Sequence, residues 1–215
     1  MITEKDFSQI AVMWEYLRQV PFDVTRRKLY SAQELYMGYD PNVEGSFESC
    51  YDSQVYHHYV AAGKQQANSM ETLAQTLHDH GIHTGLDEFF KNHDQRLSVG
   101  IMGGHAQLRT DPSYRDIVFL SKRLTEKVFC MPSGGGPGAM EATHLGAWMA
   151  GRSTSDVNDA LKYMSVAPSL KDSRWLSQPH GVHGKEILDG GYAGVSSAQV
   201  ISCNGQISEP HPLHQ

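Results

Sequence analysis

The stretch "MPSGGGPGAMEATHLGAWMAG", residues 131–151, decides the fold that the sequence predicts. It starts at the end of a short apolar run, "VFCMP" (128–132), passes through four glycines and a proline at 134–138, and continues in a helical pattern. Glycine reaches positive φ and has no Cβ, so the backbone N–H groups of such a loop can close on an anion. Pro137 suits the first turn of a helix, because its missing N–H would have no partner there. The stretch therefore predicts a strand, a phosphate-binding loop and a helix.

A second unit of the same order lies just upstream. The run "LSVGIM" (97–102) is short and apolar, and it stops at Gly103 and Gly104 as a buried parallel strand stops at a turn. In the helical pattern that follows, Asp111 stands as N-cap and Pro112 at the first helical position. Together the two units form a βαβα arrangement with a right-handed crossover. We therefore expect an α/β fold, a Rossmann-like and partly doubly wound parallel sheet, whose two glycine turns share the ligand-binding edge.

The N-terminal half of the chain has a different pattern. Apolar residues at helical spacing between 7 and 17 predict a helix that ends before Pro21. The segments "QVYHHYVAAG" and "NSMETLAQTLHDHG" predict two more helices, the second of which stops at Gly81. Residues 1–95 are therefore expected to form a helical N-terminal extension.

The remainder, residues 96–215, is expected to form an incomplete Rossmann-like nucleotide-binding domain. After Gly151 the sequence predicts one further helix, capped by Ser155, and one strand, "AQVISC" at 198–203. A βαβα unit contributes two strands, whereas a doubly wound sheet needs about five. We expect a divergent tail and an exposed sheet edge that dimerisation, another chain or disorder must cover.

Composition excludes several classes of function. A formal net charge of -6 and a pI near 6.0 give no basic field for a polyanion, so nucleic acid is not expected as a partner. Cys50, Cys130 and Cys203 lie too far apart for a CxxC motif, and the N-terminus lacks the apolar core of a signal peptide. No run of eighteen apolar residues occurs. We expect a cytoplasmic protein with reduced cysteines that does not span a membrane.

The histidines form two groups that have to be tested as metal sites. His78, His80 and His83 fall close together, but neither they nor the tail histidines match a zinc spacing with cysteines or a HExxH helix. We therefore expect no metal. The tail group comprises His180, His183, His211 and His214.

The glycine loop by itself leaves several interpretations open. Gly134, Gly136 and Ala139 satisfy the dinucleotide fingerprint, but Asp156 and Asp159, about 20 residues later, fall in a helical stretch rather than at a strand end. NAD(P) binding is therefore a minor alternative. The Walker A motif and the G-x-S-x-G nucleophile elbow are both absent from the loop. Tight packing of helix on strand, with no ligand, is the structural alternative.

The segments on either side of the glycine loop are more specific than the loop itself. "SGGGPGAMEATHLGAWMAG", preceded by "SVGIMGGHAQLRTDPSYRDIVFLSKRLT", resembles the LOG (lonely guy) family of Rossmann-like proteins, also labelled lysine decarboxylase-like. The strong resemblance covers about residues 97–151, and "GIMGGHA" and "HLGAW" are similar to larger bacterial members with an N-terminal helical extension. Matching positions are Gly103, Gly104, Arg109, Tyr114, Ser133 to Gly136, Gly138, Met140 and Glu141.

The resemblance implies a protein, usually a homodimer, that binds purine nucleoside monophosphates such as AMP and needs no further cofactor. Characterised members hydrolyse the N-glycosidic bond of nucleoside 5′-monophosphates to base and ribose 5-phosphate. Their catalytic loop, PGGxGTxxE with an upstream Arg-Lys pair, has no counterpart in this sequence, which is expected to be truncated before it. Hydrolysis through an oxocarbenium-like transition state requires a carboxylate near C1′ and usually a second group that acts on the water or on the leaving base. We therefore expect nucleotide binding without hydrolysis, with an active phosphoribohydrolase as the alternative.

Glu141 is the acid that we place at the site. It is the candidate catalytic residue if the chain is an enzyme, and its other interpretation is a favourable interaction with the helix N-terminus. Arg109 is a candidate phosphate ligand or an exposed loop arginine, and His105 a candidate ligand contact or a hydrogen-bonded loop histidine. The predicted nucleotide- and phosphate-binding set is Gly103, Gly104, His105, Arg109, Ser133, Gly134, Gly135, Gly136, Gly138, Met140 and Glu141.

Overall fold

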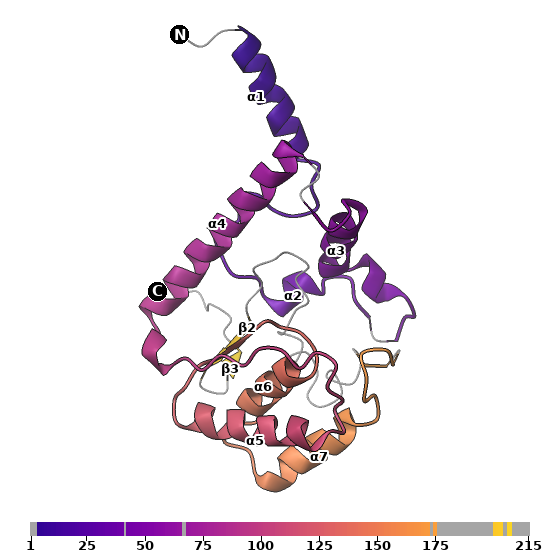
Figure 1. Cartoon of the computed structure of the whole chain (residues 1–215), viewed down its shortest axis with the longest axis vertical. Helices are drawn as coiled ribbons and strands as arrows, with labels where there is room; N and C mark the ends of the chain where they lie inside the picture. Colours follow the sequence, from indigo (N-terminus) through magenta and orange to yellow (C-terminus); the bar gives the residue numbers. More distant parts are fainter. Residues whose placement is uncertain are drawn as a thin grey trace.

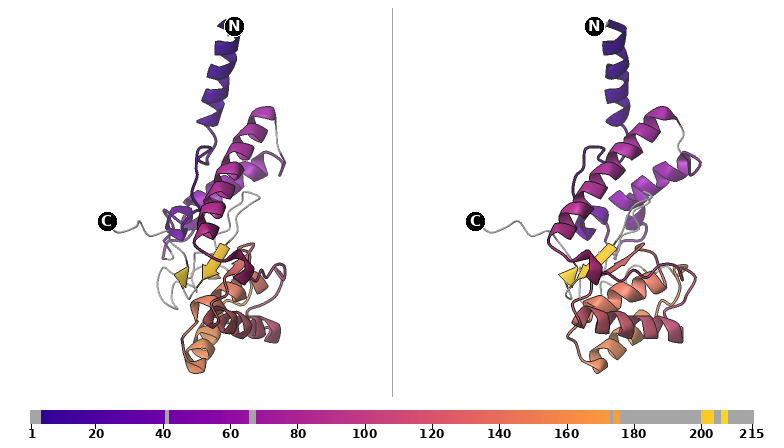
Figure 2. Two further views of the ribbon diagram at one scale, coloured as in Figure 1. Left: turned by 90° about the vertical axis from the view of Figure 1, so that its left-hand side faces the viewer. Right: turned by 60° about the vertical axis from the view of Figure 1, so that its left-hand side comes forward.

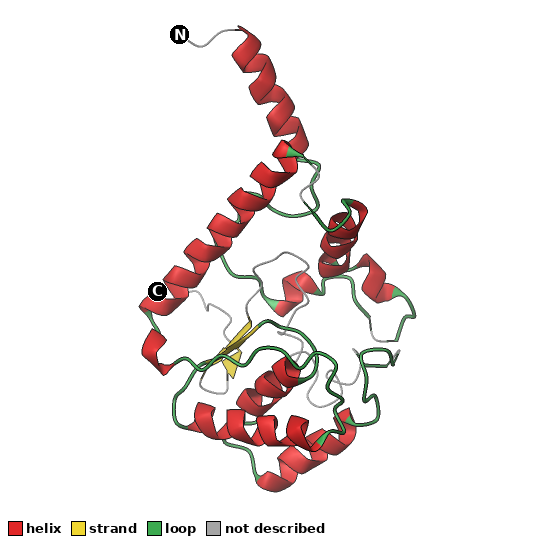
Figure 3. Cartoon of the chain, in the orientation of Figure 1, coloured by secondary structure: helices red, strands yellow, loops and turns green. Residues whose placement is uncertain are grey.

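The computed structural model describes residues 4–40, 42–65, 68–172, 174–175, 200–203 and 206–207. Helix dominates this part of the chain, and strand is confined to one small patch (Figure 3). The α-helices are α1 (Glu4–Leu17), α2 (Ala32–Leu35), α3 (Tyr51–Ala61), α4 (Ser69–Lys91), α5 (Pro112–Glu126), α6 (Ala139–Trp148) and α7 (Thr154–Met164). The short elements are the 3-10 helices η1 (Ser46–Ser49) and η2 (Gln95–Leu97) and the strands β1 (Met131–Ser133), β2 (Val200–Cys203) and β3 (Gln206–Ile207).

The helices fall into two groups along the long axis of the molecule. In Figure 1, α1 to α4 occupy one end and α5 to α7 the other, with β2 and β3 between them. Helix α1 projects from its end in all three views (Figures 1 and 2). The predicted helix between residues 7 and 17 is confirmed by α1, and the predicted helix of "QVYHHYVAAG" by α3.

Helix α4 is longer than the sequence predicts, because Gly81 does not end it. Gly81 and Gly85 are buried within α4, where the backbone of residues 26–29 crosses the helix. A Cβ on Gly81 would overlap the carbonyl oxygen of Arg26, and one on Gly85 would lie 3.0 Å from Leu29 N. These glycines are needed for a close crossing within the helix rather than for its termination.

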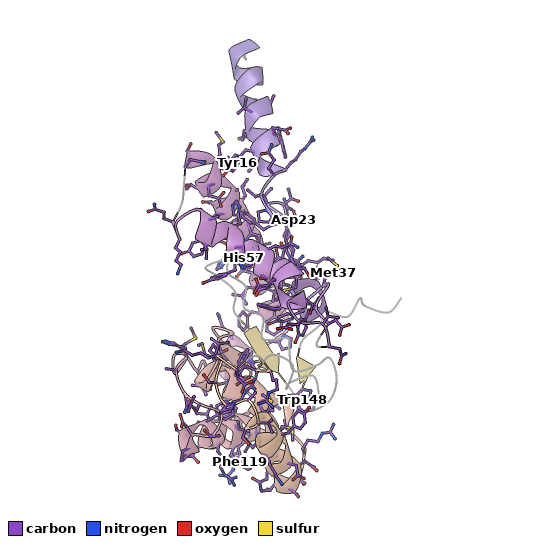
Figure 4. The ribbon with its side chains drawn as sticks, turned by 90° about the vertical axis from the view of Figure 1, so that its right-hand side faces the viewer. Tyr16, Asp23, Met37, His57, Phe119 and Trp148 are labelled. Atoms are coloured by element: carbon purple, nitrogen blue, oxygen red, sulfur yellow. The ribbon has the colours of Figure 1, made fainter. Side chains whose placement is uncertain are left out.

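The first helical group is held by an apolar cluster and a polar one. Leu17, Phe22, Val55 and Ala74 are buried together between α1, α3 and α4. Beside them the carboxylate of Glu71 accepts hydrogen bonds from three side chains on the same three helices. The donors are Tyr16 OH at 2.7 Å, Gln75 Nε2 at 2.8 Å and His58 Nε2 at 3.1 Å. Figure 4 shows Tyr16 where α1 meets the rest of this group.

The second helical group has its own core. Tyr114, Val118, Leu145, Val157 and Met164, from α5, α6 and α7, are all completely buried. Figure 4 shows the side chains of this group, with Phe119 and Trp148 labelled. The crossing of α5 and α6 is close because Gly146 has no side chain, and a Cβ there would overlap Val118 O. Helix α7 is confirmed, but its cap is Ser153, in a capping box with Asp156, and not Ser155.

The predicted Rossmann-like parallel sheet is wrong. Residues 97–102 form no regular strand; they contact the next segment through two isolated parallel bridges, Ser98 to Cys130 and Ile101 to Ser133. Strand β1 instead pairs antiparallel with β2, and β2 antiparallel with β3, in the order β1-β2-β3. Parallel strands are normally flanked by further strands and covered by helices on both faces. In the described part of the chain, the two apolar runs at 97–102 and 128–132 have no further parallel strand beside them, and they pair through the two bridges only.

The predicted strand in "AQVISC" is confirmed by β2, although it takes the place beside β1 that a parallel neighbour would have in a doubly wound sheet. Cys50 is a buried free thiol, whereas Cys130 is disulfide-bonded, so the expectation of reduced cysteines is wrong at Cys130. Among the described helices, none has both the length and the apolar character needed to cross a membrane.

Candidate functional site

The candidate site is the glycine loop between β1 and α6. Gly135 has φ +70° and Gly138 has φ +72° with ψ −125°, a backbone conformation that residues with a Cβ rarely adopt. Gly138 is also the N-cap of α6 and has no side chain with which to cap it. The chain can turn sharply here because the two positions with positive φ, Gly135 and Gly138, are both glycine. Helix α6 starts directly after this turn.

The two predicted glycine turns lie against each other. A Cβ on Gly138 would overlap the carbonyl oxygen of Gly104, and a Cβ on Gly104 would lie 2.8 Å from the Cβ of Ala139. Gly103 and Gly104 have φ of +90° and +66°. The predicted juxtaposition of the turns is therefore present without the parallel sheet that was expected to create it. Two of the glycines serve close packing as well as backbone conformation.

At the start of α6, several backbone N–H groups have no hydrogen-bond partner among the described residues. The N–H of Gly135 donates to Ser133 Oγ at 3.0 Å. The N–H groups of Gly136, Gly138 and residues 139–141 donate none of the hydrogen bonds found within the described residues, and Pro137 has no N–H. The first N–H groups of a helix carry a partial positive charge, and they require acceptors from outside the helix. Gly138 and Ala139 are buried against the turn at Gly104, whereas Gly136, Met140 and Glu141 are partly exposed. The N–H groups of these three partly exposed residues can therefore bind an anion.

Two methionines lie over the outer side of the loop. A Cβ on Gly134 would lie 3.1 Å from both Met102 Cε and Met140 Sδ, so the two thioethers occupy the space above this glycine. A Cβ on Gly136 would lie 2.5 Å from Met140 Cε. Met102 is 68% exposed. The loop therefore carries an apolar, partly exposed cover made of flexible side chains.

Arg109 is buried and points away from solvent. It is only 3% exposed, forms an ion pair with Glu141 through Nη2, and donates from Nε to Glu141 Oε2 at 3.0 Å. Its remaining donors reach the carbonyl oxygens of Ala167 at 3.0 Å and Trp175 at 3.1 Å. The guanidinium also lies 4.6 Å from the centre of the Trp175 ring. The alternative of an exposed loop arginine is wrong, and no donor of Arg109 points to the glycine loop.

Glu141 is held in the same buried cluster. Besides Arg109, the hydroxyl of Tyr114 donates to Glu141 Oε2 at 3.0 Å. Tyr114 is completely buried, and burial, followed by the negative charge of Glu141, raises the pKa of its hydroxyl well above the usual value. Tyr114 therefore keeps its proton and acts as a donor. The Glu141 carboxylate joins residues from the 103–111 loop, α5 and α6.

Ser133 and His144 form a second buried polar pair beneath the loop. Ser133 Oγ lies 2.6 Å from His144 Nε2, and the two residues are 1% and 4% exposed. Burial lowers the pKa of His144 to about 4, so the imidazole is neutral at pH 7. Sequence reasoning did not select His144. A polar residue within an otherwise apolar helix was the signal that could have identified it, since every residue of α6 from Ala142 to Trp148 is buried.

The other histidines do not join the site. His105 is exposed on the 103–111 loop. His78 is buried, with its Nε2 3.0 Å from Tyr30 OH, while His80 and His83 are exposed on α4. No group of three metal-binding side chains occurs within the part of the chain that the structure describes. The tail group of His180, His183, His211 and His214 lies outside the described residues.

In comparisons with known proteins, no family model, no curated protein and no solved structure matches this chain.

Proposed function

We propose that this protein binds a purine nucleoside monophosphate such as AMP, with its phosphate on the glycine loop, and does not hydrolyse it. The observation that supports this proposal is the set of N–H groups of Gly136 and residues 138–141 that have no partner among the described residues, next to two glycines with positive φ. Helix N-termini that follow glycine-rich loops bind phosphate through their N–H groups and their positive partial charge. The site is local, so it does not require a basic protein, and the net charge of -6 is compatible with it.

The two methionines favour a nucleotide over free phosphate. Met102 and Met140 lie at the loop and offer polarisable apolar surface next to the phosphate position. Thioether sulfur makes favourable contacts with aromatic rings, worth about 0.3–1.5 kcal/mol each. Because Met102 is largely exposed, it can move to admit a ligand. A purine carried by the phosphate would therefore find an apolar surface there.

Binding without hydrolysis follows from the state of Glu141. Its two oxygens accept hydrogen bonds from Arg109 and Tyr114, and both donors come from buried side chains. A carboxylate that attacks or activates water at C1′ has to be free to change partners. Glu141 is instead fixed as an anchor for the loop. This favours the binding protein over the phosphoribohydrolase.

Assembly and location are part of the same proposal. We propose a homodimer in the cytoplasm, where nucleoside monophosphates are available. Exposed apolar side chains on the projecting helix α1, Ile10 at 43% and Trp14 at 50%, favour contact with another chain. The disulfide at Cys130 is the observation that stands against a reducing compartment.

Calorimetric titration with AMP tests the function, using Gly134→Asp and Gly134→Asn as a matched pair. Gly134 does not have positive φ, and a side chain there meets only the flexible ends of Met102 and Met140. The two substitutions have the same shape, but only aspartate places a negative charge beside the phosphate. We expect AMP binding in the wild type and in Gly134→Asn, and its loss in Gly134→Asp. Equal affinity in the two variants would contradict phosphate binding at this loop.

The same samples, incubated and then separated by chromatography, test for free base. We expect AMP to be recovered intact. Release of adenine that disappears in Glu141→Gln would instead establish the phosphoribohydrolase and overturn the assignment of Glu141 as an anchor.

A further inference from the structure

The buried pair beneath the loop has a defined direction of hydrogen bonding. Ser133 Oγ accepts from the N–H of Gly135 at 3.0 Å, and its own proton needs an acceptor in a site with no water access. The nitrogen 2.6 Å away, His144 Nε2, is such an acceptor when the imidazole is neutral. The low pKa of His144, about 4, keeps it neutral over the physiological range. The hydroxyl therefore donates to His144 and accepts from Gly135.

This chain of bonds ends at the residue that turns the loop. The bond to Ser133 fixes the peptide group between Gly134 and Gly135. Directly after this peptide group, Gly135 turns the chain with φ +70°. The bond from Gly135 N–H to Ser133 ties the turn to the end of β1, while His144 belongs to α6, whose N-terminus carries the open N–H groups. The pair thus links the two elements on either side of the loop through side chains that a ligand does not touch.

We propose that His144 is a positioning residue for phosphate binding: through Ser133 Oγ it fixes the peptide group between Gly134 and Gly135, and so holds the turn that presents the unpaired N–H groups at the start of α6 to the ligand. This inference rests on the proposed function and deepens it. It assigns Ser133, which the sequence places among the phosphate ligands, to the support of the loop rather than to contact with phosphate. His144 acts on the loop through its acceptor nitrogen, and it makes no contact with the ligand.

The experiment uses the full chain and compares the affinities for AMP and for adenosine, which has no phosphate. Three variants carry it: Ser133→Ala, which removes the hydroxyl; His144→Leu, which removes the acceptor; and His144→Gln, which keeps an acceptor oxygen. We expect Ser133→Ala and His144→Leu each to weaken AMP binding roughly tenfold, the loss of about one buried hydrogen bond. Adenosine binding should change less than AMP binding, and His144→Gln should restore most of the AMP affinity.

The double variant Ser133→Ala/His144→Leu separates positioning from general damage. If the two residues act through one bond, the double variant binds AMP no more weakly than the weaker single variant. Losses that multiply, or equal losses for AMP and adenosine, would overturn the proposal. Should Ser133→Ala fail to fold, the comparison of His144→Leu with His144→Gln tests the proposal. A loss of AMP affinity relative to adenosine in His144→Leu but not in His144→Gln supports it, and the same ratio in both variants overturns it.

Failure of this inference is distinguishable from failure of the proposed function. If the wild type binds AMP and no variant alters the AMP-to-adenosine ratio, the positioning role is wrong and the phosphate site stands. If the wild type does not bind AMP, the phosphate site is wrong, and the positioning role is overturned with it.

Discussion

At the scale of single residues, the cluster of Arg109, Tyr114 and Glu141 has the largest energetic consequence. Arg109 has charged and carbonyl acceptors on three separate segments, and Glu141 has no other cationic partner among the described residues. A buried ion pair is costly to break, since the remaining charge stays buried and unpaired. The pair therefore supports the fold more than it supports chemistry.

We predict that Arg109→Ala lowers the free energy of unfolding by about 3–5 kcal/mol, the usual cost of removing one partner of a buried pair. Urea denaturation measures it. Arg115→Ala is the matched control: Arg115 is exposed, bonds to Asn158 at 2.8 Å and lies over the ring of Phe119. Its loss should cost about 1 kcal/mol or less. Similar losses in both variants would show that the cluster contributes nothing beyond a surface contact.

The sequence predicted which residues gather at the loop better than it predicted their roles. Spacing and the family resemblance brought Arg109 and Glu141 to one site, and the structure pairs them. The direction of the Arg109 side chain depends on the carbonyl groups of Ala167 and Trp175, which are distant in sequence and carry no motif. His144 was missed for the same reason, because a histidine within an apolar helix shows no pattern until its partner is known.

At the scale of elements, local patterns predicted most of the helices. Helical spacing located α1, α5 and α7, and Asp111 with Pro112 located the start of α5, since these signals act within a few residues. The cap predicted for α7 was wrong by two residues. Local signals failed where a tertiary contact overrides them. Gly81 has the sequence signature of a helix end, but it lies inside α4 because the backbone at Arg26 needs the space.

We predict that Gly81→Ala destabilises the protein, although alanine favours an isolated helix over glycine by about 1 kcal/mol. The added Cβ would overlap the carbonyl oxygen of Arg26, and such overpacking costs about 1–3 kcal/mol. His83→Ala, at an exposed position of the same helix, should leave the melting temperature nearly unchanged. Thermal unfolding followed by circular dichroism measures both. A higher melting temperature for Gly81→Ala would mean that the crossing at residues 26–29 is absent.

At the scale of the whole molecule, the expected parallel sheet failed because sheets depend on contacts between distant segments. Two apolar runs predicted two parallel strands, yet their pairing stops after two bridges, and the neighbour of β1 is the antiparallel strand β2. Nothing in residues 97–133 specifies how the pairing continues. The helices, in contrast, pack through cores that join neighbouring helices: one between α1, α3 and α4, and one between α5, α6 and α7.

The cluster around Glu71 gives the molecule a dependence on pH. Burial raises the pKa of Glu71, but hydrogen bonds from Tyr16, Gln75 and His58 lower it by more, so the folded-state pKa lies below its usual value. A carboxyl group with a depressed pKa contributes stability above its unfolded pKa of about 4.3, and this contribution is lost as the pH falls through the folded pKa.

We therefore predict that the wild type loses stability as the pH falls below about 4.3, and that Glu71→Gln reduces this dependence. Urea denaturation at a series of pH values measures the slope. Glu15→Gln, at an exposed site on α1, should keep the wild-type slope. An unchanged slope in Glu71→Gln would show that Tyr16, His58 and Gln75 do not stabilise a charged carboxylate.

In the function that we propose, the unpaired N–H groups at the start of α6 bind the phosphate of a nucleotide. The most direct measurement is the nuclear magnetic resonance spectrum of the nitrogen-15-labelled protein, titrated with AMP and, separately, with adenosine. We predict that the amide resonances of Gly136, Gly138 and residues 139–141 shift with AMP, and that adenosine leaves them in place. Amide shifts confined to other parts of the chain, or none at all with AMP, would contradict the account.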